Sequence, residues 1–438
     1  MVEWWIVISL IVAGLLILLA TGLPVAFSFL VINLVGVYVF WGGVTGFHQL
    51  IDSVYSSVTM FALLPVPLFV MMGEALFHSG LAFKAVDIVD KWLGRIPGRL
   101  GLVAVGSATI FSSLSGSSMG TTAMLGRVLT PEMENRGYKY PISIGSCMSG
   151  GLAMIIPPSA LAVILGAVAK VSVGKILIGG VIPGLLLGAL YALYIILRSW
   201  LQPSIAPGYE VTAVPISEKL RLTFKYVIPL GGVIFIVVGL IFFGIATPTE
   251  SAAMGALATY VLAVVFKKFN LGLLKKSVSG TLSISVMMFM ILTGSLAFSQ
   301  ILAFSGATAG LVEYASSLKV HPIILILVMQ LVVFLLGTFM ESVAIMMITM
   351  PIFLPVVNSL GYDGVWFCLL MLINLEVGMK SPPFGFLLFV MKGVAPEGTT
   401  MGQIYRATMP FIFIDMLAMG LIMIFPMLAL WLPSFMAY

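Results

Sequence analysis

The chain has 438 residues, of which 61% are hydrophobic and only 8% are charged. Soluble domains are about 25% charged and about 45–50% apolar, so a water-soluble fold of this length has no means of burying so much apolar surface. The composition therefore predicts an integral protein of the lipid bilayer and excludes soluble enzymes, nucleic-acid-binding proteins and disordered tails. In such a protein the net charge of +5 reports membrane topology and not a nucleic-acid partner.

The apolar residues are gathered in stretches of the length that a transmembrane helix needs, about 20 residues. Candidate crossings follow one another along the chain at 4–20, 23–41, 60–78, 141–169, 176–197, 226–244, 248–266, 279–303, 364–391 and 408–432. Two further apolar stretches, 100–128 and 321–357, are interrupted near the middle by small polar residues. The sequence therefore predicts an all-α polytopic membrane protein with about ten spanning helices and two irregular hairpins.

The basic residues indicate the orientation, because cytoplasmic connections of membrane proteins are enriched in lysine and arginine. Seventeen of the 21 basic residues fall on one side if both interrupted stretches enter and leave the membrane on the same side. If only one of them crossed fully, every later connection would change sides and the bias would disappear. We therefore expect two re-entrant hairpins, the first from the cytoplasm and the second from outside, and both termini outside.

Each hairpin is followed by an apolar segment that a Pro-Pro pair breaks. Pro157 follows Ser115 of the first tip by 42 residues, and Pro382 follows Thr338 of the second tip by 44. A unit that occurs twice in opposite orientation is the signature of inverted-repeat secondary transporters. We therefore divide the chain into N-terminal scaffold helices with an interfacial arm (1–99), a first repeat ending in a cytoplasmic loop (100–225), central scaffold helices (226–320) and a second repeat (321–438).

The two breaks predict binding sites for ions. Proline stops a helix and frees carbonyl groups of the preceding turn, which need a partner in lipid. A bound cation is one such partner, hydroxyl groups add oxygen ligands, and facing helix N-termini favour anionic groups. Each tip with its break therefore predicts a Na⁺ site, with an anion held between the two. The alternative is a packing seam of small residues, formed at the first tip by Ser115, Ser117, Ser118, Thr121 and Thr122.

The sequence carries no pattern typical of an enzyme. It contains no nucleotide-binding loop, no H-E-x-x-H motif and no Ser/His/Asp arrangement. Its two cysteines, Cys147 and Cys368, are far apart in apolar segments, which predicts neither a disulfide nor a metal site. We therefore expect a transporter driven by an ion gradient, with any high-affinity capture of substrate done by another protein.

Several groups of residues together carry a family resemblance. They are Ser115-Gly-Ser-Ser with Thr121-Thr-Ala-Met-Leu-Gly126, Ile156-Pro-Pro-Ser159, Gly244-Ile-Ala-Thr-Pro-Thr-Glu-Ser-Ala-Ala253, Gly337-Thr-Phe-Met-Glu341, and Asn374-Leu-Glu with Ser381-Pro-Pro-Phe-Gly385. In order and spacing, over nearly the whole chain, they resemble the large membrane subunit of TRAP (tripartite ATP-independent periplasmic) transporters. The resemblance implies an ion-transporter-superfamily fold, with a scaffold and a mobile domain that works as an elevator in the bacterial or archaeal cytoplasmic (inner) membrane.

The resemblance also implies partners and ligands. It implies Na⁺-driven uptake of an organic acid, delivered by a soluble periplasmic substrate-binding protein, and a separate small four-helix membrane subunit. Two other functions stay open: a self-sufficient ion-coupled carboxylate transporter of the same superfamily, and a purely structural or regulatory membrane subunit. The doubled polar breaks argue against the structural role, because structural helices would gain nothing from them. Uptake by the chain alone would favour the self-sufficient transporter.

The family's ion sites lie at the hairpin tips and the facing breaks, which match residues 115–122 with 150–159 and residues 337–342 with 377–383 of this sequence. The expected ligands of the two Na⁺ ions are Ser117, Ser118, Thr121, Gly151, Pro157, Gly337, Glu341, Val377 and Ser381. The expected substrate contacts are Ser115, Gly116, Ser159, Thr338, Asn374 and Lys380. No organic cofactor is expected.

The second site departs from the family pattern in two places. Glu341 stands where the family usually has aspartate, and Lys380-Ser381 stands where uncharged residues, often Leu-Thr, precede Pro-Pro. A lysine at the centre of a membrane helix costs roughly 2.5–3.5 kcal/mol, which favours a partner or a watered cavity. We hypothesise that Lys380 pairs with Glu341 and partly replaces a cation. The alternatives are that Lys380 faces an aqueous crevice and attracts anionic substrate, or that its segment is misplaced.

Overall fold

The computed structural model describes residues 3–94, 96–208 and 214–436. Every regular element in these ranges is a helix, which confirms the all-α fold predicted from the sequence. Seven of the helices are long and apolar enough to cross a membrane; they cover Phe61–Ser79, Val173–Leu201, Ile216–Phe242, Pro248–Val265, Leu271–Phe304, Ser342–Ser359 and Met401–Ile424. Four of the ten predicted stretches are missing from this set, because the helices Trp4–Ala20 and Val25–Phe40 are shorter and the stretches 141–169 and 364–391 are each split into shorter elements. One of the seven, Ser342–Ser359, lies instead in a predicted hairpin.

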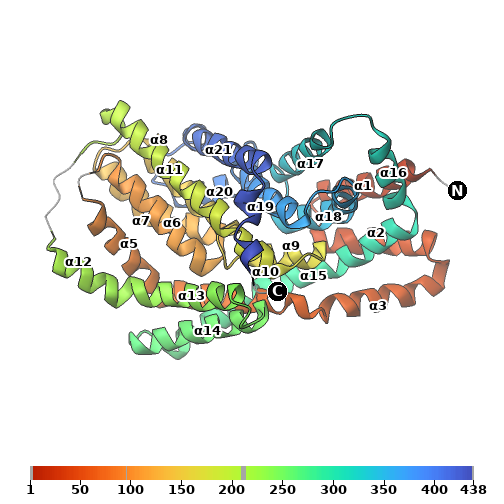
Figure 1. Ribbon diagram of the computed structural model, residues 1–438, viewed down its shortest axis with the longest axis horizontal. Coiled ribbons are helices and arrows are strands. Elements are labelled where there is room, and N and C mark those ends of the chain that lie inside the picture. Colours follow the sequence, from red (N-terminus) through yellow and green to blue (C-terminus); the bar gives the residue numbers. More distant parts are fainter. Residues whose placement is uncertain (1–2, 95, 209–213, 437–438) are drawn as a thin grey trace.

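The predicted scaffold segments form α1 (Trp4–Ala20), α2 (Val25–Phe40), α3 (Gly46–Val58), α4 (Pro65–Ser79), α5 (Leu81–Leu93), α13 (Ile228–Phe242), α14 (Pro248–Val265), α15 (Leu271–Phe304) and α16 (Ala307–Ser317). The 34 residues of α15 span about 51 Å, longer than the hydrocarbon core of a bilayer. This helix packs against both α2 and α4, and α14 packs against α4. Figure 1 shows α2, α3 and α15 running side by side away from the centre of the molecule.

Small residues let the scaffold helices approach closely. A Cβ built on Gly294 of α15 would lie 2.4 Å from Cβ of Phe29 on α2, so only glycine fits there. The Asn33 side chain of α2 donates a hydrogen bond of 2.7 Å to the Gly294 carbonyl. Lipid tails are as apolar as leucine, so such backbone proximity and interhelical hydrogen bonds are what holds membrane helices together.

The predicted repeats contain two helical hairpins. In the first, α6 (Arg99–Ser115) turns at residues 116–117 into α7 (Ser118–Asn135); in the second, α17 (Pro322–Gly337) turns at residues 338–341 into α18 (Ser342–Ser359). Both halves of each hairpin are at most 18 residues long. That each hairpin enters and leaves the membrane on one side stays a prediction.

Each hairpin is followed by an element that ends at a Pro-Pro pair. After the first come α8 (Tyr140–Ser143), the 3₁₀ segment η3 (Gly145–Met154) and α9 (Ala160–Ala169); after the second come α19 (Gly364–Lys380) and α20 (Phe386–Val394). The longer helices α11 (Val181–Leu201), after the short α10 (Val173–Gly179), and α21 (Met401–Ile424) close the two units. The short α12 (Ile216–Leu222) leads from the loop after α11 into α13.

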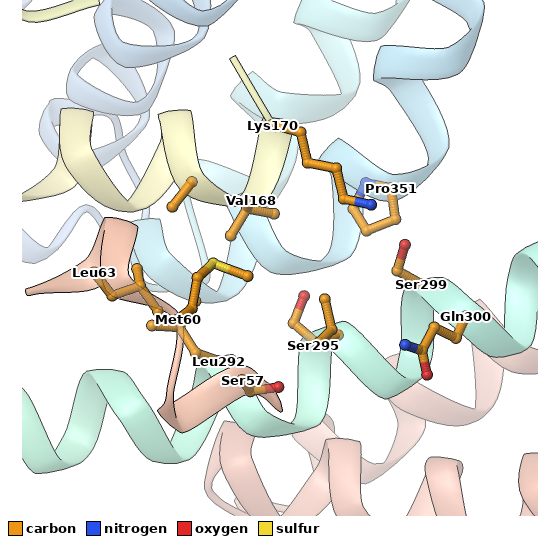
Figure 2. Close-up of a pocket in the computed structure, with 12 residues that line it drawn as sticks. Ser57, Met60, Leu63, Val168, Lys170, Leu292, Ser295, Ser299, Gln300 and Pro351 are labelled. Atoms are coloured by element: carbon orange, nitrogen blue, oxygen red, sulfur yellow. The ribbon is translucent and has the colours of Figure 1, made fainter. Parts of the chain in front are cut away.

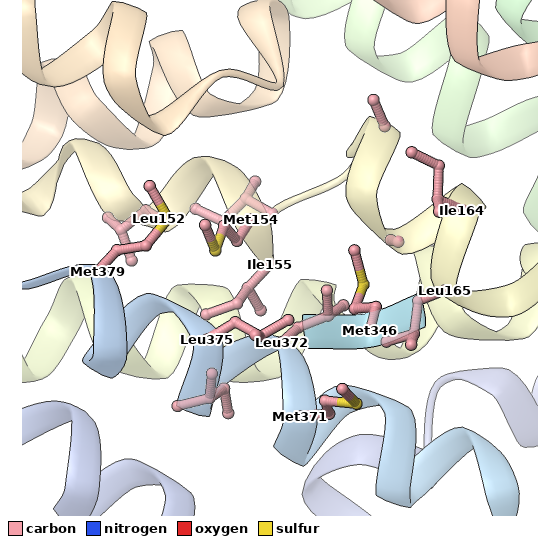
Figure 3. Packing of buried hydrophobic residues seen from close by; sticks show 14 of the residues in the cluster. Leu152, Met154, Ile155, Ile164, Leu165, Met346, Met371, Leu372, Leu375 and Met379 are labelled. Atoms are coloured by element: carbon pink, nitrogen blue, oxygen red, sulfur yellow. The ribbon is translucent and has the colours of Figure 1, made fainter. Parts of the chain in front are cut away.

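The buried core joins the two repeats. Figure 3 shows Leu152 and Met154 of η3 close to Met379 of α19, with Leu372 and Leu375 of α19 beside them and Met346 of α18 near Leu165 of α9. All of these side chains are buried. Methionine is flexible and polarizable, so it fills the irregular space that two broken helices leave between them. The breaks of both repeats therefore sit inside one packed unit.

Candidate functional site

Hydroxyl groups hold the turn of the first hairpin. Ser117 caps α7, since its Oγ accepts a hydrogen bond of 3.1 Å from the Gly120 amide. The hydroxyl oxygens of Ser115 and Thr121 lie 3.1 Å apart. Gly116, at φ +59°, adopts a left-handed conformation that glycine enters without steric cost, and a Cβ there would lie 3.2 Å from the Pro158 carbonyl oxygen. The first tip thus presents hydroxyls and a helix N-terminus beside the Pro157–Pro158 break.

The first tip also contacts the glycine pair of η3. A Cβ on Gly150 would lie 2.4 Å from Oγ1 of Thr122, so α7 and η3 meet at backbone distance. The Ser118 hydroxyl lies 3.5 Å from the Gly151 carbonyl oxygen and points toward it. Beyond the break, Ser159 caps α9 and donates a hydrogen bond of 2.8 Å to the Met154 carbonyl. Hydroxyl and carbonyl oxygens from α7, η3 and α9 therefore gather at one place.

The second tip is built differently. The Glu341 carboxylate caps α18 by accepting hydrogen bonds from the amides of Val343, at 2.9 Å, and Ala344, at 3.4 Å. The Ser342 hydroxyl lies 3.1 Å from Sδ of Met379. At the facing break, the Ser381 hydroxyl donates a hydrogen bond of 2.7 Å to the Val377 carbonyl. Gly337 packs directly on α19, where a Cβ would lie 2.8 Å from Cα of Gly378.

A cavity of about 280 Å³ brings both tips against the scaffold. Residues 115–121 of the first tip and Glu341 and Ser342 of the second line one side, and α4 and α15 line the other through Glu74, His78, Met287 and Met288. Oε2 of Glu74 lies 3.3 Å from Nε2 of His78. Among the described residues that line this cavity there is no lysine or arginine.

The predicted substrate contacts divide into two groups. Ser115 and Gly116 line the cavity, whereas Ser159, Thr338, Asn374 and Lys380 do not. The Asn374 side chain instead donates to Oε1 of Gln330 at 2.8 Å, and the Thr338 hydroxyl donates to the Leu335 carbonyl at 2.8 Å. Glu74 and His78, which do line the cavity, were missed because a Glu-x-x-x-His spacing on an apolar helix has no specific meaning in the sequence.

A smaller cavity of about 100 Å³ lies elsewhere between the scaffold and the repeats. Figure 2 shows the Lys170 side chain, just after α9, extending toward Pro351 of α18, with Ser299 and Gln300 of α15 on the facing side. Lys170 occupies the left-handed C-cap of α9 at φ +53°. A basic group therefore stands in this smaller cavity, separate from the two hairpin tips.

The structure corrects the hypothesis for Lys380. Its side chain is completely buried, and its Nζ lies 2.8 Å from Oε1 of Glu376, 3.2 Å from Oδ2 of Asp415 and 2.9 Å from the Tyr191 hydroxyl. Glu341 is engaged as the cap of α18 and is no partner of Lys380. Lys380 also faces no aqueous crevice, so neither expectation holds. The reason is helical geometry: Glu376 precedes Lys380 by four residues and shares its face of α19.

The remaining partners of Lys380 come from distant parts of the chain. The Tyr191 hydroxyl, on α11, donates to Oδ1 of Asp415, on α21, and both residues are buried. The Glu376 spacing was readable in the sequence as an i,i+4 acid–base pair. The contribution of Tyr191 and Asp415 was not, because it requires the packing of α11, α19 and α21 to be known.

The chain was compared with known proteins. Residues 12–428 match the family described as the DctM component of the tripartite ATP-independent periplasmic transporter. The C4-dicarboxylate TRAP transporter large permease protein DctM of Pseudomonas aeruginosa is 31% identical over 382 residues, which cover 86% of this chain and 87% of that protein. The sialic acid TRAP transporter large permease protein SiaM of Vibrio cholerae is 29% identical, over 97% of this chain and 98% of that protein.

The ectoine TRAP transporter large permease protein TeaC of Halomonas elongata is 26% identical, over 97% of this chain and 98% of that protein. Among solved structures, the YdaH transporter of Alcanivorax borkumensis superposes with a TM-score of 0.61 at 16% identity, covering 90% of each chain. At that identity the superposition supports the fold alone. The family match spans nearly the whole sequence, and the chain therefore belongs to the TRAP transporter large permeases, the DctM component family, which are transporters and not enzymes.

Proposed function

We propose that this chain imports an organic acid, using a Na⁺ gradient, by an elevator movement of its two repeats against the scaffold. The observation that carries the proposal is the cavity in which both hairpin tips face α4 and α15. A substrate held there would touch both repeats and the scaffold at once. The named substrates of the relatives, C4-dicarboxylates, sialic acid and ectoine, support an organic acid as the cargo.

The chemistry of the tips supports the ion coupling. The N-termini of α7 and α9 converge at the first tip, where Ser117 and Ser159 are the caps. Helix N-termini favour anions, while hydroxyl and carbonyl oxygens suit a hard cation such as Na⁺. At the second tip, Gly337, Glu341, Val377 and Ser381 offer a carboxylate, a hydroxyl and backbone carbonyls. A cation at each tip would offset the negative charge of a substrate in the cavity.

The family supports two partners for this chain, the small membrane subunit and the periplasmic substrate-binding protein. We place the chain in the inner membrane with both termini on the periplasmic side, as the distribution of basic residues predicts. In the elevator movement, α6–α11 and α17–α21 travel together, because η3 of the first repeat packs against α19 of the second. The scaffold helices, with α4 and α15 at the cavity, stay in place.

Reconstitution into proteoliposomes tests the proposal. Uptake of radiolabelled succinate, sialic acid and ectoine would be measured with an inward Na⁺ gradient, with both partners and with each left out. We expect uptake of one of these classes only with the gradient and both partners. Uptake by the chain alone would instead identify a self-sufficient transporter, and gradient-independent uptake would contradict the coupling.

A further inference from the structure

The polar cluster around Lys380 is not balanced in charge. It contains two buried carboxylates, those of Glu376 and Asp415, and one ammonium group. Asp415 is satisfied on both oxygens, since Oδ1 accepts from the Tyr191 hydroxyl and Oδ2 from Lys380. One ammonium group is therefore shared between two buried carboxylates, at 2.8 Å from Glu376 and 3.2 Å from Asp415, and the cluster carries one negative charge in excess.

Glu376 is the unsatisfied member of the cluster. Its Oε1 lies 2.8 Å from the Lys380 ammonium, but neither carboxylate oxygen accepts a hydrogen bond of good geometry among the described residues. The side chain is 1% exposed, so water does not solvate it. A carboxylate buried in a low-dielectric interior requires a cation or a full set of hydrogen bonds. Glu376 has a nearby cation, the Lys380 ammonium that it shares with Asp415, but it lacks the hydrogen bonds.

The carboxylate lies against η3, next to the first tip. A Cβ built on Gly151 would lie 1.2 Å from Oε1 and 2.5 Å from Oε2 of Glu376, so the carboxylate fills the space beside the Gly151 backbone. The Ser118 hydroxyl is a neighbour of the same carboxylate and points to the Gly151 carbonyl oxygen. Three hard oxygen donors, a carboxylate, a carbonyl and a hydroxyl, thus come together from α19, η3 and α7.

We propose that the Glu376 carboxylate is a ligand of the coupling cation at the first tip, together with the Gly151 carbonyl and the Ser118 hydroxyl. The inference rests on the proposed Na⁺ coupling and adds a ligand from the second repeat to a site otherwise formed by the first. Lys380, which also contacts Asp415 and Tyr191, is itself no ligand of this site and balances only part of the negative charge of the cluster. Because the ligands come from both repeats, binding of the cation fastens α19 to α7 and η3.

The test uses the full chain in lipid nanodiscs and follows its thermal unfolding by tryptophan fluorescence. NaCl is titrated against choline chloride at constant ionic strength, and KCl serves as the cation control. We expect Na⁺ to raise the melting temperature of the wild-type chain and Glu376→Gln to raise the half-saturating Na⁺ concentration by about ten-fold or more. The double variant Lys380→Met with Asp415→Asn removes one charge of each sign but keeps Glu376, so its half-saturating concentration should stay near the wild-type value.

The outcomes separate the two proposals. If Na⁺ stabilises the wild type and Ser117→Ala weakens that effect while Glu376→Gln does not, Glu376 is no ligand although the first tip binds Na⁺. If the double variant loses the Na⁺ response as fully as Glu376→Gln does, the cluster is only structural. If Na⁺ has no effect on the wild type, both the inference and the proposed coupling fail.

A second variant covers the case in which Glu376→Gln does not yield monodisperse protein. Lys380→Met alone removes the ammonium group and leaves both carboxylates. Without that positive charge beside the site, the half-saturating Na⁺ concentration should fall or the titration should become steeper. An unchanged titration of Lys380→Met would overturn the inference.

Discussion

Gly337 and Gly378 bring the backbones of α17 and α19 into direct contact, since a Cβ on Gly337 would lie 2.8 Å from Cα of Gly378. Neither position has room for a side chain, because the atoms in the way are backbone atoms. Gly378→Ala should therefore push the second hairpin away from its broken helix. Overpacking of a tight contact costs about 1–3 kcal/mol, so the melting temperature in nanodiscs should fall measurably.

The matched control for this variant is Gly420→Ala on α21. Gly420 also lies within a helix, but no atom comes within 4 Å of a Cβ built there. Replacing a helical glycine by alanine where the added methyl group meets no neighbour should be neutral or slightly stabilising. Equal melting temperatures for the two variants would show that the contact between α17 and α19 is looser than described.

The Lys380 cluster makes a prediction about paired substitutions. Lys380→Met alone strands two buried carboxylates, and removing one partner of a buried ion pair costs about 3–5 kcal/mol. Adding Asp415→Asn removes one of these charges, so the double variant should recover part of the lost stability. Adding Glu341→Gln to Lys380→Met should recover none, because Glu341 caps α18 away from Lys380.

Thermal unfolding of the three variants in nanodiscs measures this difference. A stabilising effect of Glu341→Gln in the Lys380→Met background, equal to that of Asp415→Asn, would restore the pairing first expected from the sequence. The order of the melting temperatures therefore decides between the two partners.

These pairings show which parts of the site a sequence can predict. Composition and apolar length predicted the all-α membrane fold, since they depend on each segment separately. The two tips could be found because small polar residues and Pro-Pro pairs are rare inside apolar stretches. The partners of Lys380 depend instead on the rotation of α11 and α21 about their axes. That rotation is set by packing, and a sequence separation of 224 between Tyr191 and Asp415 leaves no local signal.

The positions of the hairpin ends make the predicted topology testable. Gly80 lies at the turn between α4 and α5, and Asn135 ends α7. Cysteines at these two positions should both react with an impermeant maleimide only from the cytoplasmic side, because the first hairpin returns to the side that it entered. Cysteines at Ser317, the end of α16, and at Asn358 of α18 should both react from outside.

The labelling uses a variant in which both native cysteines are replaced, Cys147→Ala with Cys368→Ala, so that only the introduced cysteine reacts. Both native cysteines are buried and unpaired with each other, so their removal should change little on the surface. Labelling of positions 80 and 135 from opposite sides would mean that α6 and α7 cross the membrane once, and the re-entrant hairpin would then be rejected.

We expect the Ser117 hydroxyl to contribute to Na⁺ binding in addition to capping α7. Its Oγ accepts from the Gly120 amide, and loss of an N-cap costs about 0.5–2 kcal/mol wherever the cap lies. Ser172 is a matched control, because its Oγ caps α10 by accepting from the Lys175 amide at 3.3 Å and lies outside both tips.

Ser117→Ala and Ser172→Ala should lower the melting temperature by similar amounts in the absence of Na⁺. Only Ser117→Ala should raise the Na⁺ concentration needed for half-maximal uptake in proteoliposomes, since only there does the lost hydroxyl belong to the predicted ion site. A parallel rise in both variants would trace the effect to weakened helices, and an unchanged Na⁺ requirement in Ser117→Ala would remove this hydroxyl from the site.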